Sequence, residues 1–326
     1  MNKFTCSSFF AGVGGIDLGF EQTGQFKTVY ANEFDKYPVI TYEANFDIDV
    51  DNRDIKTVLP EEIPDFDVLL AGFPCQSFSI AGYRQGFEDS KGRGNLFFEL
   101  IRIMKVKKPR VAFFENVKNL VSHDDGNTFK VICQALTALG YHYTYKIMNA
   151  MEYGNIAQNR ERIYIIAFRD EKDFNRFTWP EPVKLTSSVK DIIDFENSVD
   201  EKYYYTKGKY KGDIYEKLEE AMKDDDPDCP SVYQWRRRYV RQNKSGVVPT
   251  LTANQGEGGH NVCLIKTTDG RIRKMTPREC FNAQGFPKDF ILPSELRDSK
   301  LYKQAGNSVC VSVINRIAEE IKNTLN

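Results

Sequence analysis

Residues 4–20 read FTCSSFFAGVGGIDLGF, a β-rich run that leads into a glycine-rich turn and then into an amphipathic stretch. Glycines permit a tight turn and let a ligand approach the backbone, while the following helix offers free N–H groups at its start. The strict pattern Gly-x-Gly-x-x-Gly would place its third glycine at position 17, where this chain has Asp17. The stretch predicts a ligand-binding strand–turn–helix unit and weakens a dinucleotide interpretation.

The alternation of strand and helix patterns continues to about residue 170. Further β-rich runs occur at residues 27–31, 67–71, 111–115, 143–148 and 162–168, after a first run at 4–10. Residues 96–106 and 129–139 carry apolar residues at helical spacing, and the second stretch ends at Gly140. This order predicts an α/β fold with a mostly parallel sheet.

The alternation breaks after the Trp-Pro-Glu-Pro stretch at residues 179–182, where a charged, tyrosine-rich region begins. Residues 307–321 again have the apolar spacing of an amphipathic helix. We therefore expect a first domain of residues 1–185, completed by a C-terminal helical segment, residues 300–326. A second, smaller domain would span residues 186–299.

Composition limits the class of protein. The 326 residues are 41% hydrophobic and 28% charged, as expected for a globular enzyme. The start of the chain lacks a signal-peptide pattern and no apolar stretch has membrane-spanning length, so we expect a cytoplasmic protein with no membrane partner. Seven scattered cysteines without a Cys-x-x-Cys pair argue against a disulfide framework or a metal cluster. The net charge of −1 does not by itself indicate nucleic-acid binding.

Cys75 is the candidate nucleophile. It follows Gly72, Phe73 and Pro74 at the exit of the apolar run 66–71. In an open α/β sheet, ligands bind just beyond the carboxyl ends of the strands, so a thiol there faces a reaction site. A cysteine considered alone is more often a buried structural residue.

Five charged residues occupy comparable positions. Glu33 lies about 20 residues after the turn, where an acidic side chain can accept hydrogen bonds from ribose hydroxyls, and Asp54 follows a possible third strand. Glu115 ends an apolar strand, where burial raises a carboxyl pKa and suits proton transfer. Arg160 and Arg162 fall on one side of an extended segment. Each could equally be an ordinary loop, cap or strand-edge charge.

Together these segments resemble the C5-cytosine DNA methyltransferase family over nearly the whole chain. The resemblance rests on six segments in order, at residues 10–15, 72–76, 115–117, 158–162, 278–287 and 304–309. It implies a Rossmann-like S-adenosylmethionine-dependent methyltransferase sheet that includes an antiparallel strand. It also implies that the second domain is a target-recognition domain and hinge, and that the first is catalytic and cofactor-binding.

The resemblance implies roles for individual residues. Cys75 would add to cytosine C6, Glu115 would stabilise a proton at N3, Arg162 would hold O2, and Arg160 would meet the DNA backbone. S-adenosylmethionine would lie over the glycine-rich turn, with Glu33 at the ribose and Asp54 near the adenine. The implied cofactor-binding set is Phe10, Ala11, Gly12, Val13, Gly14, Gly15, Glu33, Phe34, Asp54, Ile55, Gly72, Pro74, Leu96, Asn307 and Ser308.

The substrate implied is double-stranded DNA with its target cytosine flipped out, because a stacked base cannot offer C6 to a thiolate. The glycine-rich stretch 79–95 resembles the family's closing loop. Residues 234–244 hold five cations and two aromatics, and residues 249–253 resemble the family's Thr-Leu element. The expected DNA-binding residues are Gln76, Ser79, Arg236, Arg237, Arg238, Arg241, Thr250 and Leu251.

Three alternatives compete with this interpretation. A tRNA cytosine methyltransferase shares the catalytic motifs, but the sizeable segment between Gln158 and Gln304 favours DNA. A nicotinamide oxidoreductase would leave Cys75 without a role, and a catalytically dead relative would not need Cys75, Glu115 and Arg162 together. We expect a stand-alone monomer of prokaryotic or phage type, with a restriction endonuclease as a possible separate partner.

Overall fold

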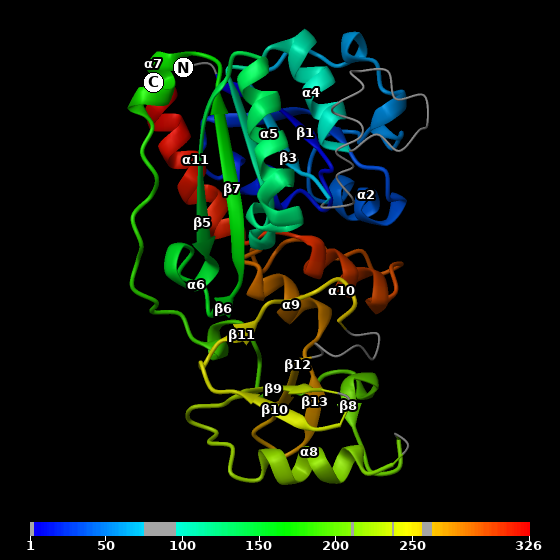
Figure 1. Ribbon diagram of the computed structural model, residues 1–326. Helices are drawn as coiled ribbons and strands as arrows, with labels where there is room; N and C mark the ends of the chain where they lie inside the picture. The colour runs from blue at the N-terminus through cyan, green and yellow to red at the C-terminus, as the bar shows by residue number, and fades with distance from the viewer. Residues whose placement is uncertain (1–2, 75–95, 210–211, 237, 256–262) are drawn as a thin grey trace. The chain divides into compact units, whose positions relative to one another are not determined.

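The computed structural model describes residues 3–74, 96–209, 212–236, 238–255 and 263–326 (Figure 1). The chain forms two compact units, each described by itself. The first unit comprises residues 1–148, 161–181 and 313–326, and the second comprises residues 149–160 and 182–312. Within the described ranges, no helix is long and apolar enough to span a membrane.

The first unit is built on a sheet that has six strands among the described residues, in the order β2-β1-β3-β4-β7-β5. Neighbours from β2 to β4 run parallel, and β7 runs antiparallel to β4. This confirms the α/β fold with a parallel-rich sheet. The strands are β1 (Phe4–Phe9), β2 (Phe26–Asn32), β3 (Val68–Gly72), β4 (Val111–Val117), β5 (His142–Asn149) and β7 (Glu161–Phe168).

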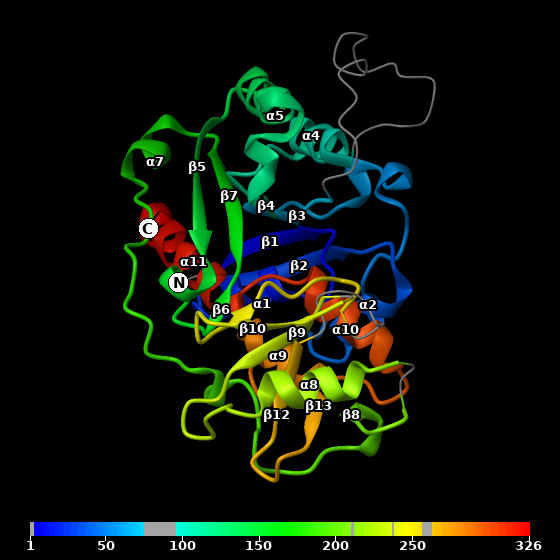
Figure 2. The same cartoon turned by 60° about the horizontal axis from the view of Figure 1, so that its bottom comes forward.

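Helices cover both faces of this sheet, because its strands are apolar on both sides. On β4, the ring of Phe113 packs against Phe20 of α1, while the next ring, Phe114, packs against Phe97 of α4. Figures 1 and 2 show α4 and α5 together on one face. The helices of this unit are α1 (Gly15–Glu21), α2 (Lys36–Glu43), α4 (Leu96–Lys107), α5 (Asn127–Ala138), α7 (Glu171–Arg176) and most of α11 (Val311–Leu325), with the short helices η1 (Ile55–Thr57), η2 (Pro60–Glu62), η3 (Lys118–Val121) and η4 (His123–Gly126).

The second unit contains a sheet with the order β10-β9-β12-β13-β8 and a parallel pair, β11-β6. The apolar face of α8 packs Leu218 and Met222 against Tyr233 and Leu264 of the sheet. The strands are β6 (Gln158–Asn159), β8 (Tyr204–Tyr205), β9 (Val232–Trp235), β10 (Val240–Asn243), β11 (Val248–Pro249), β12 (Cys263–Lys266) and β13 (Ile272–Lys274). The helices are α6 (Ala150–Tyr153), α8 (Ile214–Met222), α9 (Pro277–Ala283), α10 (Asp298–Asn307), η5 (Val189–Asp191) and η6 (Glu201–Tyr203).

The C-terminal helix differs from the sequence expectation of one helix over residues 307–321. Helix α10 ends at Asn307, Ser308 is extended with φ −75° and ψ −179°, and α11 begins only at Val311. The compact units also divide the chain differently from the expected ranges. Residues 149–160, 182–185 and 300–312 group with the second unit.

Candidate active site

The glycine-rich turn follows β1 directly and leads into α1. Its backbone takes positive φ values at Phe10 (+54°), Gly12 (+56°) and Gly14 (+81°). The N–H of Ala11 donates to the carbonyl of Asn32 at 3.1 Å, which ties the turn to the end of β2. The turn therefore lies at the carboxyl ends of two adjacent parallel strands, where ligands of α/β proteins bind.

Gly14 is the most constrained residue of the turn. A Cβ atom built on it would lie 2.3 Å from the Phe46 ring and 2.9 Å from the Tyr42 ring. Its positive φ also disfavours any side chain. Only glycine fits this position, and the turn gains a close-packed aromatic wall beside it.

Glu33 and Phe34 lie next to the turn at the end of β2. Both carboxylate oxygens of Glu33 accept main-chain N–H groups, from Gly12 at 2.9 Å and from Asp35 at 2.7 Å. The side-chain amide of Asn52 donates to the carbonyls of Glu33 and Phe34 and fixes this corner. Phe34 is 70% exposed, so its ring is open to a ligand.

The other expected cofactor contacts of the first unit lie on three elements. Asp54 caps η1 by accepting the N–H of Lys56 at 3.0 Å, and Ile55 is buried. The strand expected before Asp54 is reduced to a single bridge between Asn32 and Asp51. Gly72 ends β3, Pro74 is half-buried two residues later, and Leu96 begins α4.

Glu115 and Arg162 form an ion pair between two strands of the same sheet, at the carboxyl end of β4. Glu115 is near the end of β4, and Arg162 lies on the antiparallel strand β7 opposite Val117, two residues beyond Glu115. The Arg162 Nε lies 3.0 Å from Glu115 Oε1, and both side chains are largely buried. Arg162 also donates from Nη1 to the carbonyl of Glu161 at 2.8 Å. The structure thus brings together two of the four expected catalytic residues.

The end of β3 lies beside this pair. Gly72 is in register with Glu115, and a Cβ on Gly72 would lie 3.5 Å from Glu115 Oε2. The buried side-chain amide of Asn116 donates to the carbonyl of Phe73 at 2.8 Å. Asn116 therefore fixes the segment that leads to position 75, a positioning role that the sequence did not reveal. Cys75, Gln76, Ser79 and the loop 79–95 lie outside the described residues.

Arg160 differs from its expected position at the DNA backbone. Strand β6 ends at Asn159 and β7 begins at Glu161, so Arg160 lies at a break and does not share a face with Arg162. It is 2% exposed, and its guanidinium donates to the carbonyls of Leu251 (3.0 Å), Gly306 (3.3 Å) and Ser308. A guanidinium engaged in this way holds protein segments together and is not free to contact a phosphate.

The second unit gathers the remaining expected residues around Arg160. Thr250 donates from its hydroxyl to the carbonyl of Asn159 at 2.6 Å. Leu251 is 1% exposed, so its side chain belongs to the core and does not face DNA as expected. Asn307 is exposed at the end of α10, and Ser308 is buried beside Arg160.

The basic segment forms the turn of the β9–β10 hairpin. Val240 pairs with Trp235, which leaves residues 236–239 to connect the strands. The Arg236 N–H donates to the carbonyl of Tyr239 at 2.8 Å. Arg238 and Arg241 are exposed, as is the Tyr239 ring, whereas Arg237 lies outside the described residues. The hairpin therefore exposes cationic and aromatic side chains among its described residues.

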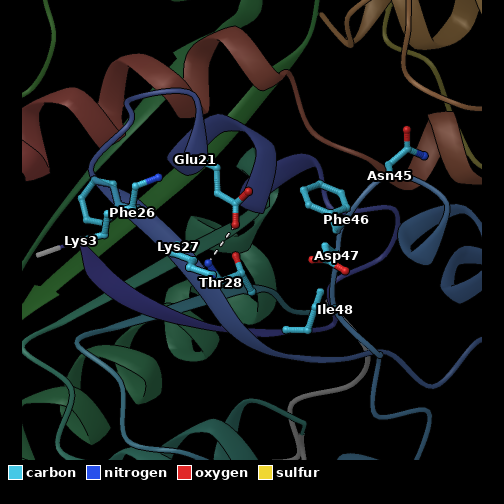
Figure 3. Close-up of a pocket in the computed structure, with 9 residues that line it drawn as sticks. All are labelled: Lys3, Glu21, Phe26, Lys27, Thr28, Asn45, Phe46, Asp47 and Ile48. Atoms are coloured by element: carbon cyan, nitrogen blue, oxygen red, sulfur yellow. Dashed lines mark hydrogen bonds between the residues drawn. The ribbon is translucent and has the colours of Figure 1, made fainter.

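A pocket of about 390 Å³ lies on the first unit among the ends of β1, β2 and α1 (Figure 3). Its lining includes Lys27, Thr28 and Phe46, and Glu21 accepts the N–H of Thr28 there at 2.9 Å. None of the expected site residues lines this pocket. The pocket and the glycine-rich turn share one neighbour, Phe46, which lines the pocket and also packs against Gly14.

A parallel-rich α/β sheet with a glycine-rich first turn, in which a largely buried acidic–basic pair joins β4 to β7, is typical of the class of enzymes that bind a nucleotide-containing cofactor at the carboxyl ends of the strands. The sequence profile of one family within that class, described as C-5 cytosine-specific DNA methylase, matches residues 4–323. The chain belongs to this family. The tRNA methyltransferase and nicotinamide oxidoreductase alternatives are not favoured.

Curated relatives agree with the family assignment. The chain is 59% identical to the Type II methyltransferase M.Bsp6I of Bacillus sp. (strain RFL6), over 97% of each chain. It is 39% identical to the Type II methyltransferase M.HhaI of Haemophilus parahaemolyticus, over 97% of this chain and 94% of that one. The solved structure of Spodoptera frugiperda DNMT2, in a mutant form, matches with TM-score 0.73 at 21% identity, over 98% of this chain and 100% of that one. That likeness concerns the fold alone.

Proposed function

We propose that the protein transfers a methyl group from S-adenosylmethionine to C5 of a flipped-out cytosine within a specific sequence of duplex DNA. The observation that carries this proposal is the Glu115–Arg162 pair, 3.0 Å apart beside the carboxyl end of β3. Cytosine presents O2 and N3 as adjacent acceptors on one edge. A carboxyl group and a guanidinium held side by side match that edge.

The cofactor site is proposed at the turn of residues 10–15. A Cβ on Gly14 would clash with Phe46 and Tyr42, so the turn needs glycine here to keep its shape. The Glu33 carboxylate is fixed beside the turn by the N–H groups of Gly12 and Asp35, and a carboxylate there is an acceptor of the kind that suits ribose hydroxyls. The exposed Phe34 ring suits the face of an adenine. These residues fit S-adenosylmethionine, which when bound supplies an electrophilic methyl group on a sulfonium.

The chain's own groups would make cytosine reactive. The thiolate of Cys75 adds to C6 while Glu115 stabilises a proton at N3, which converts the ring to an enamine with electron density at C5. Arg162 donates to O2 and holds the ring in place. After methylation at C5, a base removes the C5 proton, the electron pair re-forms the C5–C6 double bond, and Cys75 leaves as a thiolate while N3 returns its proton. A thiolate suits both addition and departure.

Sequence recognition is proposed for residues 186–299. The β9–β10 hairpin offers Arg236, Arg238 and Arg241 to phosphates or guanine edges, together with Arg237. The Thr250 hydroxyl is held by the carbonyl of Asn159, and Thr250, Leu251, Gln76 and Ser79 complete the set of residues expected from the sequence to bind DNA. The Type II names of the relatives favour a separate restriction endonuclease as a partner in the cell. We expect the methyltransferase itself to act as a monomer.

The test uses tritiated S-adenosylmethionine with duplex DNA and with tRNA as separate substrates. We expect label in 5-methylcytosine of duplex DNA and not in tRNA. Cys75→Ser should lower transfer by about 10³-fold or more while cofactor binding persists, because the hydroxyl is a far weaker nucleophile at neutral pH. Cys229→Ser is the matched control, since that thiol is free and exposed, and it should transfer normally. Transfer to tRNA alone would overturn the proposed substrate.

A further inference from the structure

A buried carboxylate lies beneath the glycine-rich turn and takes no part in the chemistry above. Asp17, in the first turn of α1, is 0% exposed. Its Oδ2 accepts the hydroxyl of Ser8 at 2.9 Å, and its Oδ1 accepts the hydroxyls of Thr28 and Tyr42, each at 3.1 Å. These three donors come from β1, β2 and α2, so one side chain joins four elements.

The bond to Tyr42 reaches the cofactor turn. The Tyr42 ring is stacked on Phe46 with their centroids 4.4 Å apart. These are the two rings that a Cβ on Gly14 would meet, so they form the wall against the turn. The pocket in Figure 3 lies on Phe46 and leaves space into which that ring could shift. The Asp17–Tyr42 bond holds the inner ring of the pair against such a shift.

The bonds from Asp17 to Ser8 and Thr28 also affect the turn. Ser8 lies near the end of β1, two residues before Phe10, where the backbone enters its positive-φ conformation. Thr28 holds the neighbouring strand β2, whose last residue, Asn32, accepts the N–H of Ala11. Both strands that support the turn are therefore fixed to the same carboxylate.

Burying a carboxylate is unfavourable unless its hydrogen bonds are complete. An apolar side chain would fill the same space without that cost, but it would leave three buried hydroxyls without this acceptor. The carboxylate therefore contributes a fixed orientation of β1, β2 and α2. The titratable groups that interact electrostatically with it are Cys6 of β1 and Tyr42 of α2.

We infer that Asp17 is a positioning residue for the cofactor, which fixes the shape of the turn at residues 10–15 through Ser8, Thr28 and Tyr42. The inference rests on the proposed S-adenosylmethionine site and deepens it. Asp17 does not touch the cofactor in this scheme. It acts by keeping the wall formed by Tyr42 and Phe46 closed against Gly14 before the cofactor arrives.

The test measures the Kd for S-adenosylmethionine by calorimetry, together with KM for cofactor, KM for DNA and kcat. Asp17→Ala should weaken cofactor binding about tenfold, with KM for DNA and kcat little changed. The reason is that losing this acceptor releases the three hydroxyl groups that fix the shape of the cofactor-binding turn. Asp17→Asn should recover most of the affinity, because its amide oxygen still accepts Thr28 and Tyr42. If Asp17→Ala fails to fold, Tyr42→Phe, which removes one bond, should weaken binding about threefold.

Asp173→Ala is the matched control. Asp173 is another buried carboxylate of this unit, bonded to Arg110 at 2.6 Å and remote in sequence from the turn. Its loss should lower the melting temperature without changing the cofactor Kd. Asp17→Ala or Tyr42→Phe with a wild-type Kd would overturn the inference. A wild-type protein that fails to bind S-adenosylmethionine would instead overturn the proposed function on which the inference rests.

Discussion

At the scale of single residues, Asp17 makes stability depend on pH. Burial is the main cause that raises its pKa from 3.8 to about 6, and the three hydroxyl bonds only partly oppose it. Because the folded pKa lies above the unfolded value, the ionised group costs stability above about pH 6. That cost, about 3 kcal/mol for a shift of this size, disappears as the pH falls from about 6 to about 4.

Asp17→Asn removes this titration and leaves a side chain of the same shape. We expect the melting temperature of the variant minus that of the wild type to be larger at about pH 8 than at about pH 5, because only the wild type then carries the buried charge. Thermal unfolding of both proteins across this range measures the difference. A difference that stays constant with pH would contradict an ionised, buried Asp17.

At the scale of elements, Arg160 joins the segment after β11 to the end of α10. Removing its guanidinium would leave the buried carbonyls of Leu251, Gly306 and Ser308 without that donor. We expect Arg160→Ala to destabilise the protein by roughly 3 kcal/mol, since each lost buried partner costs about 1 kcal/mol or more. Arg160→Lys should recover little, because an ammonium cannot reach three carbonyls as a fork.

The contact between α10 and the segment after β11 can also be tested at Gly306. A Cβ on Gly306 would lie 2.2 Å from the carbonyl carbon of Thr252, a backbone atom that cannot move cheaply. Gly306→Ala should therefore lower the melting temperature as well. Arg241→Ala is the control, because that arginine is exposed, and its melting temperature should stay near wild type. A stable Arg160→Ala protein with normal cofactor binding and weakened DNA binding would instead support direct contact with DNA.

The sequence predicted the strands of the first unit to within two residues at each end. Apolar runs bounded by turn residues mark strands that are buried on both faces, so the first and last residues of each strand can be located from the sequence. The split between α10 and α11 was missed because apolar spacing continues across Ser308 and the break carries neither glycine nor proline. Arg160 was placed with Arg162 because a period of two assumes one continuous strand, whereas the strand is interrupted between them.

At the scale of the whole molecule, the sequence predicted Glu115 and Arg162 as members of one site but not the distance between them. Motif order assigned both to the site, and the antiparallel register of β4 and β7 then sets them 3.0 Å apart. The partners of Asp17 could not be predicted, because they are 9, 11 and 25 residues distant and meet only when β1, β2 and α2 pack. The sole signal was an aspartate where a glycine pattern would have continued.

The most direct test of the account is covalent trapping on duplex DNA that contains 5-fluorocytosine at the target position. With fluorine in place of hydrogen at C5, the methylated adduct has no C5 proton for a base to remove. Cys75 therefore cannot be eliminated, and the covalent adduct should persist. We predict a denaturation-resistant complex that requires S-adenosylmethionine, with the DNA attached at Cys75 in peptide mass spectrometry. Failure to trap a complex under conditions that methylate ordinary duplex, or attachment at another residue, would contradict the account.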